Sequence, residues 1–187
     1  MILYVNGDSH AMAACAVNNY KVASDDPLLA HLGKLPHPEN LAASWAKNLS
    51  LAIRSGLHCE ATIDSTIDTI IVSSRDYIKT AKLTDILIII QWPATIDDHE
   101  KIWKFHQELD KKNIKHIFFN SVNTFANIRY RQDWGSNFIE PYNDSYTSII
   151  KNAKIETVSP ESEYFGKDGH AFWNRFLLNH IIKHKFI

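Results

Sequence analysis

The segment DILIIIQW, residues 85–92, constrains the fold more than any other part of the sequence. Its apolar run from Ile86 to Ile90 has no polar interruption, so a strand formed here is apolar on both faces. Such strands are typical of the interior of a parallel sheet, which is covered by helices on each side. The run is also far too short to cross a bilayer. The segment therefore predicts the central strand of an α/β protein.

The rest of the chain alternates between strand and helix patterns. Further strands are predicted at 2–5, 58–63 and 115–121, and helices at 9–17, 40–56, 68–81, 97–113, 143–151 and 172–185. A proline-containing loop is expected at 18–40. The alternation predicts a single domain, residues 1–187, with a three-layer sandwich. We expect a mainly parallel sheet of four to five strands with helices on both faces, and a site at the carboxyl ends of the strands.

Composition limits the partners that we expect. The 187 residues carry a net charge of -1, which gives no electrostatic reason to expect nucleic acid or an anionic membrane as a partner. The two cysteines show no metal-site spacing, and no signal-peptide pattern opens the chain. We therefore expect a cytoplasmic protein without a metal or cofactor, and the composition leaves its oligomeric state open.

The turn Asn6-Gly7-Asp8-Ser9-His10 follows the first predicted strand. A serine just past a strand-to-helix turn, behind a glycine, exposes its hydroxyl and aims its backbone N–H at a nearby oxygen. Ser9 is therefore a candidate nucleophile. The alternative is a helix cap, which is the commoner role of serine or aspartate at such a junction.

A serine nucleophile needs a base, and the base needs an orienting partner. The best candidates are His170 as base and Asp168 as its orienting carboxylate, in KDGH just before the last predicted helix. Asp168-Gly169-His170 could equally be a turn that caps this helix.

These two blocks, Gly7-Asp8-Ser9 after a strand and Asp168-Gly169-His170 before a closing helix, resemble the SGNH (GDSL-type) hydrolase superfamily. The chain looks most similar to uncharacterised SGNH-like proteins of phages and environmental bacteria, which share the NGDSH turn and a PHP-N-L segment, here residues 36–41. The resemblance implies a flavodoxin-like SGNH fold and a triad of Ser9, His170 and Asp168. One residue separates Asp168 from His170, whereas the family usually has two.

The resemblance also implies where an oxyanion hole would lie. Its donors would be the backbone of Ser9, the turn at Asp64 where the family has glycine, and Gln91 where the family has a third block with asparagine. A carboxylate at Asp64 opposes the charge that develops on an oxyanion unless it points away or is protonated. Gln91 could equally serve only to satisfy the end of its strand.

Five further side chains are candidates for the wall of a substrate pocket. Their alternative roles are to cap helices, to form turns or to fill the core. These candidates are Asp8, His10, His37, Trp92 and Trp134.

Three functions follow from these patterns. The first is a serine esterase that cleaves an ester, such as an O-acetyl group on a carbohydrate or another small polar substrate, through the Ser-His-Asp triad. The second is an SGNH-like binding or structural protein that has lost this chemistry, because two of the four family blocks are altered. The third is a metal-dependent phosphoesterase, since Asp8-x-His10 resembles a metal-ligand pair of calcineurin-like enzymes, although the other motifs of those enzymes are missing.

Overall fold

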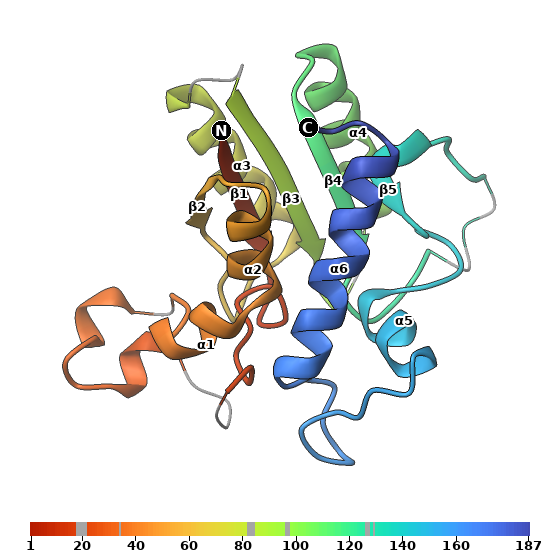
Figure 1. Cartoon of the computed structure of the whole chain (residues 1–187). Helices are drawn as coiled ribbons and strands as arrows, with labels where there is room; N and C mark the ends of the chain where they lie inside the picture. Colours follow the sequence, from red (N-terminus) through yellow and green to blue (C-terminus); the bar gives the residue numbers. More distant parts are fainter. Residues whose placement is uncertain (18–21, 34, 82–84, 96–97, 126–127, 129) are drawn as a thin grey trace.

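The computed structural model contains a five-stranded sheet in which every pair of neighbouring strands is parallel (Figure 1). It describes residues 1–17, 22–33, 35–81, 85–95, 98–125, 128 and 130–187. The strands are β1 (Ile2–Gly7), β2 (Gly56–Cys59), β3 (Ile86–Trp92), β4 (Lys115–Asn120) and β5 (Phe138–Ile139). Their order, β2-β1-β3-β4-β5, is the flavodoxin-like order. β3 is central and buried along its whole length, which confirms the α/β prediction.

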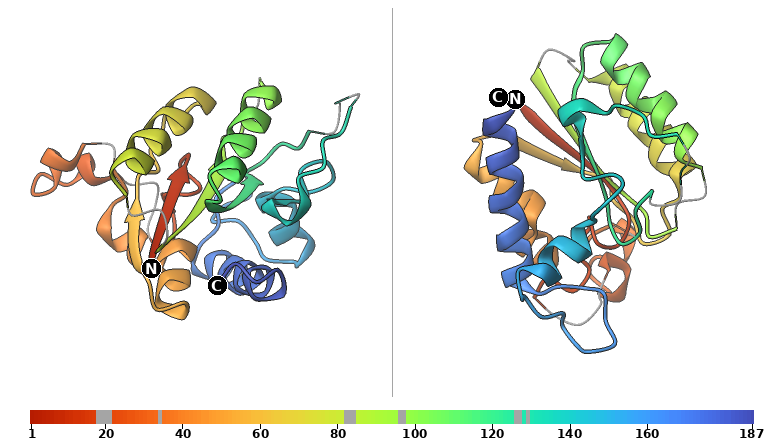
Figure 2. Two further views of the ribbon diagram at one scale, coloured as in Figure 1. Left: turned by 90° about the horizontal axis from the view of Figure 1, so that it is seen from above. Right: turned by 90° about the vertical axis from the view of Figure 1, so that its right-hand side faces the viewer.

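Helices cover both faces of the sheet (Figure 2). They are α1 (Pro38–Ala43), α2 (Trp45–Ala52), α3 (Ile67–Thr80), α4 (His99–Lys111), α5 (Tyr146–Asn152) and α6 (Lys167–Lys183). Short 3-10 helices lie at η1 (Ala23–Asp25), η2 (Ala30–Leu32) and η4 (Gly135–Asn137). Within the described residues, no helix is both long and apolar enough to span a membrane.

Alternating side chains of the strands form two hydrophobic cores. Leu3 and Ile89 face α2, α5 and α6, where Trp45 and Trp173 fill the layer. Their neighbours along the strands face α3 and α4 on the opposite side. This period of two follows from the pleat of a strand, and it builds the three-layer sandwich.

Two segments differ from the helices that the sequence predicts. Residues 9–15 form consecutive turns instead of a helix, and Ala13 adopts a positive φ of 58° that no α-helix accommodates. The helix expected at 40–56 is divided into α1 and α2 at Ser44, whose extended backbone ends the first helix and whose hydroxyl accepts from Lys47 N to begin the second. Local helix propensity is weak enough for tertiary packing to override it.

The last helix begins five residues earlier than expected, at Lys167. Gly169 therefore lies inside a helix and is not a turn residue. A Cβ at this position would lie 2.4 Å from Phe165 Cβ, so glycine is needed for close packing. Asp168 and His170 both fall in the first turn of α6 as a result.

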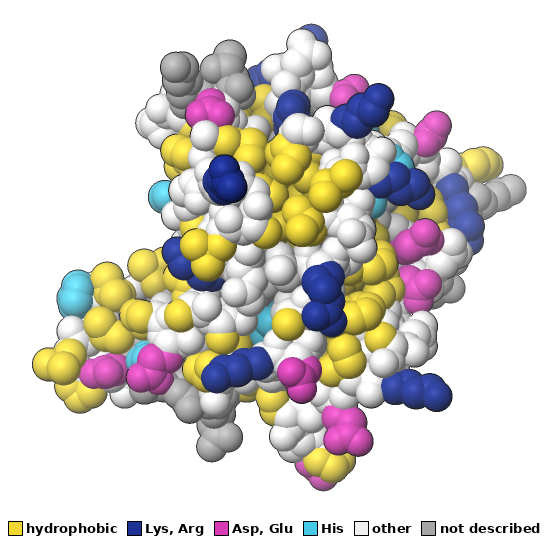
Figure 3. Space-filling view, in the orientation of Figure 1, with side chains coloured by type: hydrophobic (Ala, Val, Ile, Leu, Met, Phe, Trp, Pro, Cys, Tyr) yellow, Lys and Arg dark blue, Asp and Glu magenta, His cyan; other side chains and the backbone are white. Residues whose placement is uncertain are grey.

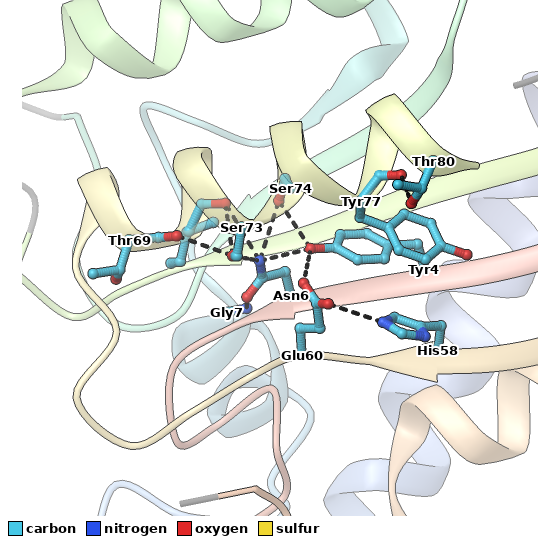
Figure 4. A network of polar contacts seen from close by, with 11 residues as sticks. Tyr4, Asn6, Gly7, His58, Glu60, Thr69, Ser73, Ser74, Tyr77 and Thr80 are labelled. Carbon is cyan, nitrogen blue, oxygen red and sulfur yellow. Dashed lines mark hydrogen bonds and ion pairs between the residues drawn. The ribbon is translucent and has the colours of Figure 1, made fainter.

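A polar network fixes the end of β1 beneath α3 (Figure 4). Asn6 Nδ2 donates to Tyr4 Oη at 2.9 Å and to Ser73 Oγ at 2.8 Å, while its Oδ1 accepts from Gly7 N at 2.8 Å. Tyr4 in turn donates to Glu60 Oε2 at 2.8 Å. These bonds hold the backbone at the point where β1 enters the NGDSH turn.

The face covered by α2 and α6 carries exposed apolar side chains where the two helices lie side by side (Figure 3). Leu51 is 63% exposed and Ile182 is 60% exposed. Both residues lie near the carboxyl ends of their helices, towards the amino ends of the strands. This patch is therefore on the opposite edge of the sheet from the NGDSH turn.

Candidate functional site

The site begins at Gly7, which no other residue can replace without strain. Its φ is +152°, and a Cβ there would lie 2.6 Å from the carbonyl oxygen of Gln91 and 2.7 Å from Ala11 Cβ. The close approach of β1 to β3 therefore depends on glycine. It directs Asp8, Ser9 and His10 to the carboxyl edge of the sheet.

Asp8 stabilises the turn and connects it to β4. Its Oδ1 accepts from His10 N at 3.0 Å, and its Oδ2 accepts from Ser121 Oγ at 2.9 Å. Burial raises the pKa of the carboxyl group, against the opposing effects of His10 and the hydrogen bond from Ser121. The carboxylate thus has a structural role in the geometry observed.

Ser9 Oγ has one hydrogen-bond partner among the described residues, the phenol oxygen of Tyr164 at 2.7 Å. Burial raises the pKa of this phenol, and the nearby Asp8 and Glu163 raise it further, whereas the bond to Ser9 lowers it. The phenol is therefore protonated at neutral pH. A protonated phenol holds the serine hydroxyl in place but does not remove its proton.

His170 and Asp168 point in different directions from α6. Residues two apart on a helix are separated by about 200° around its axis, so they do not face each other. His170 is buried and Asp168 is exposed. Across the described residues, no hydrogen bond or ion pair joins His170 to either Asp168 or Ser9.

His170 instead contacts the start of α2. Its Nδ1 accepts from Trp45 N at 3.4 Å, a long hydrogen bond that gives an otherwise unpaired helix N–H an acceptor. Burial lowers the pKa of His170 to about 3, with a further effect from His10. The imidazole is therefore neutral at pH 7 and joins α6 to α2.

His10 is in direct contact with Tyr164, the hydrogen-bond partner of Ser9. Its ring stacks on Tyr164 with a centroid distance of 4.5 Å and contacts Tyr146 edge-on at 6.0 Å. Neither ring nitrogen has a hydrogen-bond partner among the described residues. Burial lowers the pKa of His10 in spite of Asp8 and Glu163, so the imidazole is neutral, with one donor and one acceptor that no described residue engages.

A cleft of about 480 Å³ lies beside Ser9. It brings together the NGDSH turn, the start of α3, the segment after β3 and the segment before α6. Its walls are Asp8, Ser9, His10, Ile63, Asp64, Ser65, Thr66, Ile67, Pro93, Ala94, Thr95, Glu163 and Tyr164. Asp64, a sequence-based candidate for the oxyanion hole, thus lines the cleft beside Ser9.

Gln91 lies at the same edge but outside the walls of this cleft. Its side chain is fully buried, and neither amide atom has a hydrogen-bond partner among the residues that the structure describes. Its carbonyl oxygen is the atom that would lie 2.6 Å from a Cβ at position 7.

The remaining pocket candidates have structural contacts. His37 precedes α1, and its Nδ1 accepts from Glu39 N at 3.3 Å. Trp92 packs edge-on against Phe118 in the core beneath α3 and α4. Trp134 is in the same core and donates to Tyr142 Oη at 3.0 Å. None of these three side chains lines the cleft beside Ser9.

A metal site at Asp8 and His10 would need at least one further ligand. Within the part of the chain that the structure describes, no group of three or more histidine, cysteine or acidic residues is placed to hold a metal ion. Both carboxylate oxygens of Asp8 are already hydrogen-bonded.

Several residues of the site are absent from the sequence-based candidates, and Tyr164 and Ser121 are the two with direct hydrogen bonds to the NGDSH turn. Ser121 follows the fourth strand, where polar residues at a carboxyl end are a usable signal. Tyr164 carries no such signal, because only the folded chain brings the segment before α6 to Ser9. No protein-family model matches the sequence, and no curated protein matches it either.

Proposed function

We propose that this chain is a small-molecule binding protein with an SGNH-like fold, in which Ser9 contacts the ligand and is not an activated nucleophile. The observation that carries the proposal is the 2.7 Å hydrogen bond from Ser9 Oγ to a tyrosine instead of an imidazole. Serine reacts with esters only when a base removes its proton. A protonated phenol leaves Ser9 with the hydrogen-bonding capacity of an ordinary hydroxyl.

The cleft suits a neutral ligand rich in hydroxyl groups, such as a carbohydrate. Its volume of about 480 Å³ is within the usual range for small-molecule sites. Ser9, Thr95 and Tyr164 contribute hydroxyls, and a hydroxyl can both donate and accept. The hydroxyls of Ser65 and Thr66 also line the cleft, but they are bonded to Thr62 and Thr69. The neutral imidazole of His10 adds one donor and one acceptor that have no partner among the described residues.

Labelling with a fluorophosphonate tests the unreactive serine. We expect the folded wild-type protein to remain unmodified under conditions that fully label an active serine esterase, as judged by intact mass. Ser9→Ala is the matched control for reaction at other sites. Stoichiometric modification of Ser9 would contradict the proposal.

Binding is tested separately by ligand-detected NMR with a panel of neutral methyl glycosides. We expect Ser9→Ala to weaken any observed binding by roughly 3- to 10-fold, because one uncharged hydrogen bond is lost. Failure of the whole panel to bind would contradict a carbohydrate ligand, and unchanged affinity in Ser9→Ala would contradict a contact with Ser9.

A serine ester hydrolase is the second candidate, and the placement of Ser9 in a cleft beside a neutral histidine favours it. In this reaction Ser9 Oγ attacks the ester carbonyl and a histidine accepts the hydroxyl proton. The histidine then protonates the leaving alcohol and activates water for deacylation. His170 could act only after a rearrangement, because its Nδ1 now accepts from Trp45 N. Turnover of p-nitrophenyl acetate that is abolished by Ser9→Ala and by His170→Ala would support this candidate.

A further inference from the structure

We propose that Tyr164 occupies the position of the general base for Ser9, and that this substitution of phenol for base is what keeps Ser9 unreactive. The inference rests on the proposed binding function, and it identifies Tyr164 as the residue that makes the chain a binding protein instead of a hydrolase. It begins from the 2.7 Å contact between Ser9 Oγ and Tyr164 Oη, which is within the distance that a base requires.

The backbone around Tyr164 is held independently of its side chain. Tyr164 O accepts from Val158 N at 2.9 Å, and Tyr164 N donates to Ser162 Oγ at 3.0 Å. The next residue, Phe165, forms a bridge with Thr157 and is buried in the core. A different side chain at position 164 would therefore start from the same place beside the cleft.

The charges around Tyr164 favour a cationic base and disfavour an anionic one. Asp8 and Glu163 both act on this phenol and oppose its ionisation to phenolate. The same negative charges would stabilise the imidazolium that forms when an imidazole takes the proton of Ser9. Burial opposes the charged form of either base, as it does for the neighbouring His10, so it is the charges alone that favour a histidine-type base over the phenol that is present.

His10 does not fill this role in the observed geometry. Its ring lies face to face with Tyr164, at an interplanar angle of 20°. Among the described residues, no hydrogen bond joins a ring nitrogen of His10 to Ser9 Oγ, whereas Tyr164 Oη makes one at 2.7 Å. The contact with Ser9 Oγ belongs to Tyr164.

The test restores a base at this position in two ways. In Tyr164→His the base is part of the side chain. In Tyr164→Ala, imidazole added to the solution can enter the space that the phenol ring leaves. An imidazole side chain is shorter than a phenol, so the second variant does not depend on its reach. Tyr164→Phe is the matched control, because it removes the hydroxyl and supplies no base. Circular dichroism establishes that each variant is folded.

The readout is the rate at which a labelled fluorophosphonate modifies Ser9. Ser9 Oγ forms the bond to phosphorus, fluoride leaves, and the hydroxyl proton passes to the imidazole. General bases typically contribute about 10²- to 10⁴-fold to such rates, so we expect at least a tenfold increase in Tyr164→His. In Tyr164→Ala we expect an increase that saturates with imidazole, and in both cases Ser9→Ala abolishes labelling.

Three results would overturn the inference. One is the absence of labelling in both folded variants, with imidazole present for Tyr164→Ala. Another is equal activation of Tyr164→Phe, which would mean that removal of the hydroxyl suffices and a base lies elsewhere. The third is labelling of the wild-type protein at the rate of Tyr164→His. The third result would contradict the binding function as well, whereas the first leaves that function standing.

Discussion

At the scale of single residues, the site depends on side chains that are held in place by buried partners. Gly7 allows β1 and β3 to approach, Asp8 accepts from Ser121, and Tyr164 accepts or donates at Ser9. Each of these contacts fixes a polar group at the carboxyl edge of the sheet. The positions of Ser9 and of the Gly7-Asp8 turn at this edge could be predicted from the sequence, since apolar residues before an Asn-Gly pair indicate a strand end. The partner of Ser9 could not, because it comes from a segment 155 residues away.

Gly7→Ala tests the close approach of the two strands. We expect it to lower the free energy of unfolding by about 2–4 kcal/mol, because the new Cβ would overlap the Gln91 carbonyl at a φ that alanine rarely adopts. Urea denaturation monitored by circular dichroism measures the change. Gly56→Ala is the control, since its Cβ would meet no atom nearer than 4.0 Å. Equal effects of the two substitutions would contradict this explanation.

At the scale of secondary-structure elements, the strongest patterns in the sequence predicted the structure best. β3 and α4 are formed where the apolar run and the amphipathic period indicate them. The sequence predicts the start of α6 too late, because the glycine in Asp168-Gly169-His170 indicates a turn before the helix. In the structure, Gly169 is helical and allows Phe165 to pack closely. Packing of this kind depends on a residue's neighbours in space, and no local pattern encodes it.

Neutral buried histidines join several of these elements and predict a loss of stability in acid. Burial lowers the pKa of His170 to about 3 and that of His116 to about 4. His116 is hydrogen-bonded to His106 at 2.8 Å, between β4 and α4. Because both pKa values are below that of an unfolded histidine, about 6.5, the unfolded chain binds more protons in acid. Stability present above pH 6.5 is therefore lost as the pH falls towards 4.

We expect each of these two histidines to contribute a loss of the order of 3 kcal/mol between pH 6.5 and pH 4. Urea denaturation across this range measures the decrease in the free energy of unfolding. His116→Gln and His170→Gln should each make the free energy of unfolding less dependent on pH. Comparison of each variant with the wild-type protein at pH 7 gives the effect of the substitution itself. If the free energy of unfolding of both variants falls with pH as steeply as that of the wild-type protein, the loss does not come from these two histidines.

At the scale of the whole molecule, the site joins the two ends of the sequence. Ser9 follows the first strand and Tyr164 precedes the last helix, and both reach the cleft at the carboxyl edge of the sheet. The segment formed by residues 22–33 and 35–37 extends from the body of the protein on this side (Figure 1). The sequence predicts it as a loop, and the structure adds η1 and η2 within it.

This extended segment should be the first part of the chain that a protease cuts. Leu28 is 84% exposed, and the surrounding backbone forms only short 3-10 helices and turns. Limited digestion with thermolysin, which cleaves before apolar residues, should give initial cuts within residues 24–35, identified by mass spectrometry. Initial cuts within α3 or α4 would contradict the expectation.

The strand that carries the NGDSH turn lies inside the sheet, where Ile2 pairs with Gly56 on one side and with Ile86 on the other. Pairing of residues so distant in sequence is slow, because the intervening loop must close first. During translation β1 must therefore wait until residues 86–92 have emerged before it gains its second neighbour. Ser9 meets Tyr164 later still, because residue 164 follows all five strands in the sequence, so the cleft is completed only after the strands of the sheet have been synthesised.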